Sequence, residues 1–390
     1  MSLAFMQTAL AEKARDGYLR SRQCVEYEQE GVICINGKHF LNFSSNDYLG
    51  MRQHPDVLQA WVEGLAKYGG GAGASPLVTG YTRAHAEVEA YVASMLNRDA
   101  VILFNSGFAA NQALCQALFS QPGTIFADKL MHASAIDGAR HSDATIKRFK
   151  HNDVQHLKTL LDKSSSDKNL IMSEGVFSMD GDVAPIHDLI GLSEQSQATL
   201  MLDDAHGFGV LGEQGGGTVD ALSLSQEKVP VLMATFGKAI GTAGAFVAGS
   251  QTLIDYLINF ARHYIYSTAM PSAQAVATLQ SLKLLSKNDS RSVLVENIRY
   301  FRQQASAQGI PLTASETAIQ PIIIGHPVKA VAIAERLQSL GVWVTAIRYP
   351  TVPKHQDRLR VTLSAQHSLQ DIQALVDALH IVLGEQECLS

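Results

Sequence analysis

The sequence has few cysteines: only Cys24, Cys34, Cys115 and Cys388 occur among 390 residues. They are scattered along the chain, and no two of them form a C-x-x-C pair. Disulfide frameworks and zinc sites of the finger type depend on such spacing, so the pattern argues against both. We expect the chain to work in a reducing, cytoplasmic environment.

The sequence also lacks a concentration of positive charge. It has 31 Lys and Arg against 37 Asp and Glu, which gives a net charge of -6, and it contains no basic run. We therefore expect neither a nucleic-acid partner nor a membrane partner. The N-terminus has no charged start followed by an apolar run, so no signal peptide is predicted.

One apolar stretch, Val231–Gly249, is about as long as a membrane span. It carries Lys238 in its middle together with several glycines. We predict two short buried strands joined by a functional loop.

Short apolar runs alternate with longer helical patterns through the middle of the chain. Runs without polar alternation are typical of strands buried on both faces, and their alternation with helices predicts a mainly parallel sheet. The runs are Val101–Phe104, Thr124–Ala127, Ile146–Phe149, Leu170–Met172, Leu200–Leu202, Val231–Thr235 and Gly244–Ala248. The sequence thus predicts an α/β fold.

Changes of pattern divide the chain into three predicted segments. Residues 1–45 should form an N-terminal arm of a helix and a hairpin, because Asn36-Gly37 is a strong hairpin signal. Residues 46–285 should form the large α/β domain. The polar stretch Ser286–Ser292 marks the boundary to a small α+β domain, residues 286–390, whose last helix should begin at Ser368 with a capping box to Asp371.

The residues that follow the predicted strands carry the chemistry, because ligands of open α/β sheets bind at the carboxyl ends of strands. The strand ending at Phe104 is followed by a small turn, Asn105–Asn111, that leads into a helix. Free N–H groups at such a helix start bind phosphate well. An ordinary strand–helix turn is the alternative reading.

Two further strand ends carry an acid and a lysine. Asp203 ends a buried strand, where a charge needs a partner such as a protonated ring nitrogen, and His206 follows it. A metal site built on Asp-Asp-x-His is an alternative, but no other cluster in the sequence completes it. Lys238 stands among apolar and small residues, and a desolvated lysine can form a Schiff base.

His132 and Ser178 follow two other strands, and Thr235 lies three residues before Lys238. A lone histidine in a loop is more often structural. A functional role for His132 is therefore supported only by its position at this edge of the sheet. Together the strand ends offer a lysine, a carboxylate and a phosphate turn. Pyridoxal 5'-phosphate needs these three groups for its aldehyde, ring nitrogen and phosphate.

On these residues the chain resembles the α-oxoamine synthase family of fold-type I pyridoxal-phosphate enzymes, nearly end to end. The strings that carry the resemblance are LNFSSNDYLG (Leu41–Gly50), SGFAANQA (Ser106–Ala113), HNDVQHL (His151–Leu157), EGVFSMDGD (Glu174–Asp182), DDAHGFGVLGEQG (Asp203–Gly215), TFGKAIG (Thr235–Gly241), ARHYIYSTAMP (Ala261–Pro271) and WVTAIRYPTVP (Trp343–Pro353). The resemblance implies a transferase with a mainly parallel seven-stranded sheet in the large domain and a small C-terminal α+β domain.

The resemblance also implies a reaction: L-alanine condenses with a pimeloyl thioester, on coenzyme A or acyl carrier protein, and loses carbon dioxide. Lys238 would hold the cofactor and take the α-proton, Asp203 would face the ring nitrogen, His206 would lie near the phenolic oxygen, and His132 would stack on the ring. The remaining cofactor contacts would be Gly107, Phe108, Ser178 and Thr235. No metal is implied.

Substrate contacts follow from the same resemblance. Arg360 matches the arginine that holds the amino-acid carboxylate, and a planar guanidinium suits that role. Arg20 and Thr351 match positions that contact the acyl substrate, and Asn46 and His132 are further predicted substrate contacts. Arg22 is an alternative to Arg20, because it lies two residues away.

The family works as a homodimer, and Ser267 and Thr268 match a segment that reaches the phosphate in the neighbouring subunit.

Rival activities within the family are glycine C-acetyltransferase, 5-aminolevulinate synthase and serine palmitoyltransferase, which use glycine or serine. The strings HNDVQHL, ARHYIYSTAMP and TAIRYPTVP favour alanine and the pimeloyl group. A nicotinamide dehydrogenase is disfavoured, because Gly71-x-Gly73 is followed by Pro76 where the dinucleotide fingerprint needs glycine. A non-catalytic pyridoxal-phosphate sensor would need a further domain for which no region remains.

Overall fold

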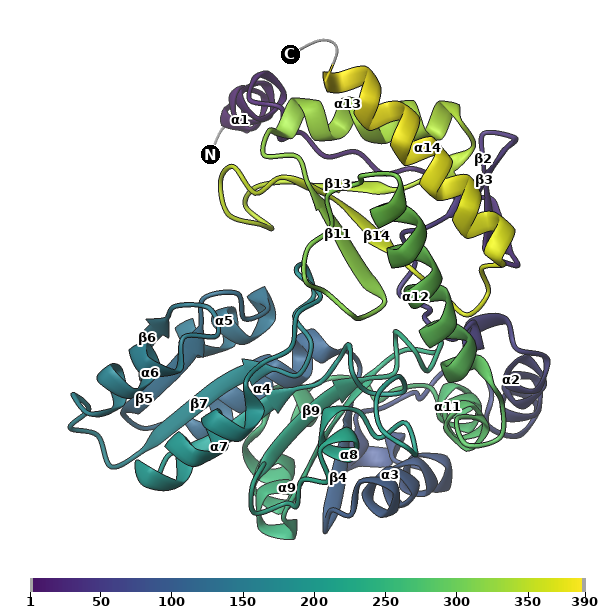
Figure 1. Ribbon diagram of the computed structural model, residues 1–390. Coiled ribbons are helices and arrows are strands. Elements are labelled where there is room, and N and C mark those ends of the chain that lie inside the picture. The colour runs from purple at the N-terminus through teal and green to yellow at the C-terminus, as the bar shows by residue number, and fades with distance from the viewer. Residues whose placement is uncertain (1–2, 388–390) are drawn as a thin grey trace. The chain divides into compact units, whose positions relative to one another are not determined.

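A computed structural model describes residues 3–387 of the chain (Figure 1). The described residues form two compact units. Unit 1 consists of the described residues within Met1–Tyr48, Met179–Asp182 and Ser290–Ser390. Unit 2 consists of Leu49–Ser178 and Val183–Asp289. The predicted arm therefore belongs to the same unit as the C-terminal residues, and the three-segment division stays a prediction. Cys388 lies outside the described residues.

Unit 2 is built on a seven-stranded sheet in the order β4-β10-β9-β8-β7-β5-β6. Its strands are β4 (Ala100–Phe104), β5 (Gly123–Asp128), β6 (Ala144–Phe149), β7 (Asn169–Glu174), β8 (Thr199–Asp203), β9 (Val231–Thr235) and β10 (Ala245–Gly249). β10 runs antiparallel to β4 and β9, and the other neighbouring strands of the sheet are parallel. The seven apolar runs of the sequence are these strands, and the mainly parallel sheet is confirmed.

The strand order brings the chemistry-bearing strand ends to one edge. Strands β7, β8 and β9 are parallel neighbours, with Glu174 of β7 opposite Asp203 of β8 and Asp203 opposite Met233 of β9. Because β10 is antiparallel to both β9 and β4, β4 also ends at this edge. Carboxyl ends of parallel strands are where α/β sheets bind ligands.

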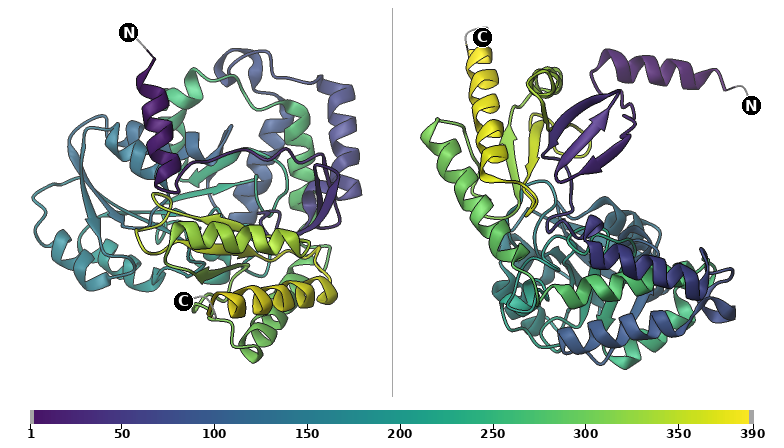
Figure 2. Two further views of the ribbon diagram at one scale, coloured as in Figure 1. Left: turned by 90° about the horizontal axis from the view of Figure 1, so that it is seen from above. Right: turned by 90° about the vertical axis from the view of Figure 1, so that its right-hand side faces the viewer.

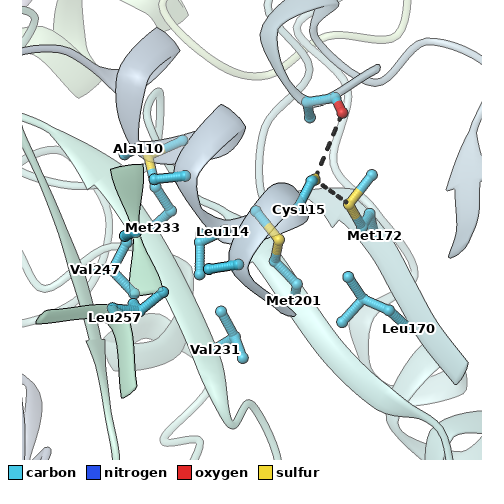
Figure 3. Packing of buried hydrophobic residues seen from close by; sticks show 14 of the residues in the cluster. Ala110, Leu114, Cys115, Leu170, Met172, Met201, Val231, Met233, Val247 and Leu257 are labelled. Carbon is cyan, nitrogen blue, oxygen red and sulfur yellow. Dashed lines mark hydrogen bonds between the residues drawn. The ribbon is translucent and has the colours of Figure 1, made fainter. Parts of the chain in front are cut away.

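Helices cover the sheet, and one face carries a cluster of buried apolar residues (Figure 3). Leu114 and Cys115 come from α4 (Gly107–Leu118) and pack on Met172, Met201 and Val231 of the strands. The Cys115 thiol lies 3.7 Å from the Met172 sulfur. Because α4 is fixed on the sheet in this way, its first turn is fixed at the end of β4.

Other helices of unit 2 complete its layers. They are α2 (Pro55–Tyr68), α3 (Arg83–Leu96), α5 (Ala133–Arg140), α6 (Val154–Leu161), α7 (Ile186–Gln195), α8 (Thr218–Ala221), α9 (Gln251–Phe260), α10 (Arg262–Ile265) and α11 (Ser272–Leu284), with short helices η1 (Met51–Gln53) and η2 (Pro76–Gly80). Within residues 3–387, none of the helices has the length and hydropathy that crossing a membrane requires. The apolar stretch Val231–Gly249 forms β9, a loop and β10, as predicted.

Unit 1 contains two small sheets. One has the order β1-β2-β3-β12 and the other β11-β14-β13. Their strands are β1 (Tyr27–Gln29), β2 (Val32–Ile35), β3 (Lys38–Asn42), β11 (Ile319–Ile323), β12 (Val342–Trp343), β13 (Thr345–Ile347) and β14 (Arg358–Thr362). The pairing of β3 with β12 joins the N-terminal hairpin to the C-terminal part of the chain.

The helices of unit 1 are α1 (Phe5–Arg15), α12 (Ser290–Ala307), α13 (Pro327–Ser339) and α14 (Leu369–Glu387). Figure 2 shows α12 and α14 side by side, whereas α1 projects from the strands of its unit and buries none of its residues. The predicted hairpin turn is confirmed, with positive φ at Asn36 and Gly37. The predicted capping box is confirmed too: Ser368 N–H donates to Asp371 at 2.8 Å and Asp371 N–H donates to the Ser368 hydroxyl at 3.1 Å.

Candidate active site

A cavity of about 180 Å³ lies at the carboxyl edge of the seven-stranded sheet, entirely within unit 2. Loops after five strands contribute to its wall. It is lined by Gly107, Phe108, Asn111, His132, Ser134, Glu174, Asp203, Ala205, His206, Met233, Thr235 and Lys238. The structure thus brings together the predicted turn, acid, histidines, threonine and lysine from segments far apart in the sequence.

The first turn of α4 forms one wall. Ser106 caps the helix, because its side chain accepts the Ala109 N–H at 3.2 Å, and Gly107 begins the helix. Phe108 follows and is exposed. The leading N–H groups of a helix of this length and its positive dipole end favour an anion such as phosphate.

Lys238 stands in the loop between β9 and β10, and its Nζ atom lies 2.8 Å from Nε2 of His206. The loop closes tightly, because the Gly241 N–H donates to the Lys238 carbonyl at 2.8 Å. Gly241 has a φ of 71°, and a Cβ there would lie 2.3 Å from the Arg52 nitrogen. Glycine is therefore required at this turn, which holds the half-buried lysine toward the cavity.

Asp203 ends β8 with a buried carboxylate. Its Oδ2 accepts a hydrogen bond from the Asn111 amide at 2.8 Å, and its Oδ1 accepts the Ala205 N–H at 3.1 Å. Charge-assisted hydrogen bonds of this kind stabilise a buried carboxylate.

His132 caps α5 and its ring lines the cavity. Nδ1 lies 2.7 Å from the Ser134 hydroxyl and accepts the Ser134 N–H at 3.3 Å. The imidazole is exposed on the cavity side, yet the surrounding protein excludes enough water to lower its pKa. Loss of hydration disfavours the charged imidazolium.

Two further buried carboxyl groups adjoin Asp203. Glu174 accepts the His132 N–H at 2.6 Å and the Ser178 N–H at 3.3 Å. Burial, and next to it the charge of Asp203, raises the pKa of Glu174 well above its ordinary value. Burial raises the pKa of Asp204 to about 7, although two hydrogen bonds from Thr218 oppose the shift.

Four of the predicted substrate contacts, Arg20, Asn46, Thr351 and Arg360, lie in unit 1, and the fifth, His132, lies in unit 2. Arg360 on β14 is buried, and its Nη1 donates to Asn46 Oδ1 at 3.1 Å and to Thr362 Oγ1 at 2.9 Å. Arg20 donates to the Thr351 hydroxyl at 3.0 Å. The predicted acyl contacts Arg20 and Thr351 are therefore neighbours.

Three predicted cofactor contacts do not line the cavity around Lys238. Ser178 is buried behind it and held by Glu174. Ser267 and Thr268 line a separate cavity of unit 2, where the Asn105 amide donates to the Thr268 carbonyl at 2.6 Å. Their predicted role in the neighbouring subunit stays a prediction.

Sequence reasoning did not select Asn111, Ser134 and Glu174 as site residues. Each had a signal: Asn111 lies one helical turn after Gly107, Ser134 two residues after His132, and Glu174 at a strand end. The hydrogen bonds from Asn111 to Asp203 and from His132 to Glu174 depend on tertiary structure, and spacing alone does not reveal them.

The chemistry of this donor set fits pyridoxal phosphate. A helix start suits the phosphate, and the lysine suits an aldehyde. The buried Asp203 carboxylate, which accepts hydrogen bonds from the Asn111 amide and the Ala205 N–H, suits a protonated ring nitrogen. Among residues 3–387, no group of three or more His, Cys, Asp or Glu side chains is placed to hold a metal ion.

The chain is similar to known proteins along almost its whole length. Residues 38–379 match the family described as aminotransferase class I and II. The 8-amino-7-oxononanoate synthase of Aeromonas hydrophila is 48% identical over 375 residues, which cover 96% of this chain and 94% of that protein. The synthase of Cronobacter sakazakii is 46% identical over 378 residues, 97% of this chain and 98% of that protein.

Solved structures are similar as well. A serine palmitoyltransferase from S. paucimobilis, solved with bound PLP and myriocin, has a TM-score of 0.93 and 26% identity, with 98% of each chain covered. The 8-amino-7-oxononanoate synthase of Francisella tularensis has a TM-score of 0.78 and 32% identity over 89% of this chain and 99% of that chain. The chain belongs to the aminotransferase class I and II family and, within it, to the 8-amino-7-oxononanoate synthases.

Proposed function

We propose that the chain is a pyridoxal-phosphate-dependent acyltransferase that condenses L-alanine with a pimeloyl thioester. The products are 8-amino-7-oxononanoate, carbon dioxide and the free thiol, a step of biotin synthesis. The observation that carries this proposal is the cavity with Lys238, Asp203 and the α4 turn, in a chain 48% identical to a curated synthase of that name along almost its whole length. The thioester is pimeloyl-CoA or pimeloyl-acyl carrier protein.

When bound, pyridoxal phosphate supplies an aldehyde for amines and a ring that withdraws electrons from the substrate α-carbon. Lys238 is the amine that attaches the cofactor and then removes the α-proton. Its Nζ lies 2.8 Å from His206, and this contact orients the amine. Asp203 keeps the ring nitrogen protonated, because a buried carboxylate favours a positive partner.

The other cavity residues position the cofactor. The turn at Gly107 and Phe108 binds the phosphate with N–H groups, and Thr235 adds a hydroxyl beside it. His132 would pack on the ring and contact substrate, and Ser178, which does not line the cavity, is assigned to the cofactor by the resemblance alone. These roles rest on the cavity geometry together with the resemblance to the α-oxoamine synthases.

Substrate recognition is assigned to residues of unit 1. Arg360 binds the alanine carboxylate, and its guanidinium is already oriented by Asn46 and Thr362. Arg20 and Thr351, which share a hydrogen bond of 3.0 Å, contact the acyl substrate, and Asn46 is a further contact.

The working form is a homodimer in the cytoplasm. Exposed apolar side chains on α2 and η2 of unit 2 support an interface, because a soluble monomer seldom leaves so many uncovered. They are Leu58, Val62, Leu65, Leu77 and Val78. In the dimer, Ser267 and Thr268 reach the phosphate of the neighbouring subunit. Cys24, Cys34 and Cys115 are free thiols, which fits a reducing compartment.

A thiol-release assay over a matrix of substrates tests the function. Alanine, glycine and serine are each combined with pimeloyl-CoA, pimeloyl-acyl carrier protein, acetyl-CoA, succinyl-CoA and palmitoyl-CoA. We expect alanine with a pimeloyl thioester to give the highest kcat/KM. Faster turnover of glycine with acetyl-CoA, or of serine with palmitoyl-CoA, would refute the proposed substrates.

A further inference from the structure

A chain of hydrogen bonds joins the carboxylate of Asp203 to the ring of His132. Its centre is Asn111, which lies one turn into α4. The Asn111 Nδ2 atom is 2.8 Å from Asp203 Oδ2 and 2.9 Å from Ser134 Oγ. One amide group has two hydrogens, so each contact receives one of them.

The second half of the chain runs through Ser134. Its Oγ accepts a hydrogen from Asn111 and lies 2.7 Å from Nδ1 of His132, where it donates its own hydrogen if Nδ1 is the acceptor. The Ser134 N–H points to the same Nδ1 at 3.3 Å. An Nδ1 that accepts carries no hydrogen, so the neutral ring holds its hydrogen on Nε2.

Both linking side chains are almost fully buried: Asn111 and Ser134 are each 1% exposed. The Asn111 Oδ1 atom is buried and has no hydrogen-bond partner among the described residues. Turning the amide over would place that oxygen against the Asp203 carboxylate, which would be repulsive. The two donated hydrogen bonds therefore fix the orientation of the amide.

We infer that Asn111 and Ser134 are positioning residues that couple Asp203 to His132. They hold the carboxylate in place and set the tautomer of the imidazole, so the two side chains assigned to the cofactor ring are held as one unit. The inference rests on the proposed function for the identity of that ring. It adds a coupling between residues that spacing and resemblance treat separately.

A double-mutant cycle tests the coupling. The apo forms of the wild type, Asn111→Leu, Ser134→Ala and the double variant are titrated with pyridoxal phosphate, and visible circular dichroism follows the bound cofactor. Each single change should weaken binding by roughly tenfold, because a buried hydrogen bond is lost. Of the two single variants, one will bind the cofactor less tightly, and the double variant should bind at most about twofold less tightly than that one. Either change alone already breaks the chain of hydrogen bonds. The dichroic band should change in every variant of the cycle.

Ser193→Ala is the matched control. Its hydroxyl is also buried in unit 2, but it donates to the Ala198 carbonyl at 2.6 Å, outside the cavity. This variant should keep the wild-type affinity and dichroic band. If Asn111→Leu does not fold, as judged by thermal unfolding of the apo protein, Asn111→Ala takes its place in the cycle.

Additive losses of affinity, or an unchanged dichroic band, would overturn the coupling. The imidazole nitrogen shifts of His132 give a second test: the apo protein should show hydrogen on Nε2, and Ser134→Ala should show a mixture of tautomers. If the wild type binds the cofactor but releases no thiol from alanine and pimeloyl-CoA, the proposed function is refuted. The cofactor affinities of the double-mutant cycle can still be interpreted in that case. An active wild type with an additive cycle refutes only the coupling.

Discussion

The Nζ atom of Lys238 lies 2.8 Å from Nε2 of His206, although the two residues come from loops after different strands. The contact is possible because β8 and β9 are parallel neighbours and end at the same edge of the sheet. A ring nitrogen at this distance shares a hydrogen with the amine and limits its rotation. The contact therefore holds the lysine amine at the wall of the cavity.

Replacing Lys238 by alanine should abolish covalent attachment of pyridoxal phosphate. Activity should fall by at least about 10³-fold, because both the attaching amine and the base are removed. Mass spectrometry after borohydride reduction measures the attachment, and thiol release measures the activity. Lys228→Ala is the control, since Lys228 is exposed and pairs with Glu194. A variant at position 238 that still gains the cofactor mass would refute the assignment.

Replacing Glu174 by glutamine should weaken the binding of pyridoxal phosphate by roughly tenfold. The carboxyl group accepts the backbone N–H of His132 at 2.6 Å and the backbone N–H of Ser178 at 3.3 Å. Glutamine keeps the shape but has only one acceptor oxygen, so one segment loses its anchor. Fluorescence titration of the apo protein measures the affinity.

Asp220→Asn is a matched control for Glu174. The Asp220 carboxylate also accepts two backbone N–H groups, from Gln214 at 2.8 Å and Gly216 at 3.0 Å, but Asp220 does not line the cavity. This variant should bind the cofactor as the wild type does. Equal losses in both variants would show a general effect on loops and contradict a specific role for Glu174.

The sequence was sufficient to predict the seven strands of unit 2, because strands buried on both faces leave uninterrupted apolar runs. It also predicted that Lys238, Asp203 and Gly107 lie together, because Asp203 ends a strand and the other two follow strand ends by three residues. Periodicity could not predict that β3 pairs with β12, since the partners lie about three hundred residues apart. The sequence therefore predicts the N-terminal hairpin as a part of its own, and the pairing with β12 is a contact that this prediction does not include.

Side chains that support the site were harder to predict. Asn111 lies in an apolar helix and reads as an ordinary polar interruption until α4 is placed over β8. The link from Ser134 to His132 is local, but its continuation to Asp203 crosses from α5 to α4 and β8. Such contacts are fixed by packing, and packing is not visible in residue spacing.

Asp204→Asn should remove a pH dependence of stability. The Asp204 carboxyl accepts hydrogen bonds from Thr218 at 2.6 Å and 2.7 Å, and burial raises its pKa from 3.8 to about 7. Because the folded chain then binds more protons than the unfolded chain, stability is full below about pH 4 and falls as the pH rises to about 7. A shift of about three units corresponds to a loss on the order of 4 kcal/mol.

Denaturant midpoints of the apo protein between about pH 4.5 and 8 measure this dependence. The wild type should lose stability across the window, and the asparagine variant should lose less. Glu174, whose pKa is also raised, is present in both proteins, so the difference between them isolates Asp204. Parallel curves would contradict a neutral, buried Asp204.

Replacing Arg360 by lysine should raise the KM for alanine by about a hundredfold and leave the affinity for pyridoxal phosphate unchanged. The guanidinium is buried, and its contacts to Asn46 and Thr362 fix its plane for a carboxylate. Lysine keeps the charge but cannot make two parallel hydrogen bonds. Arg302→Lys is the control, because Arg302 is a half-buried arginine of the same unit that binds Gln320 at 3.0 Å and is not a predicted substrate contact. A loss of cofactor affinity equal to the change in KM would show that Arg360 maintains the fold and does not bind the amino acid.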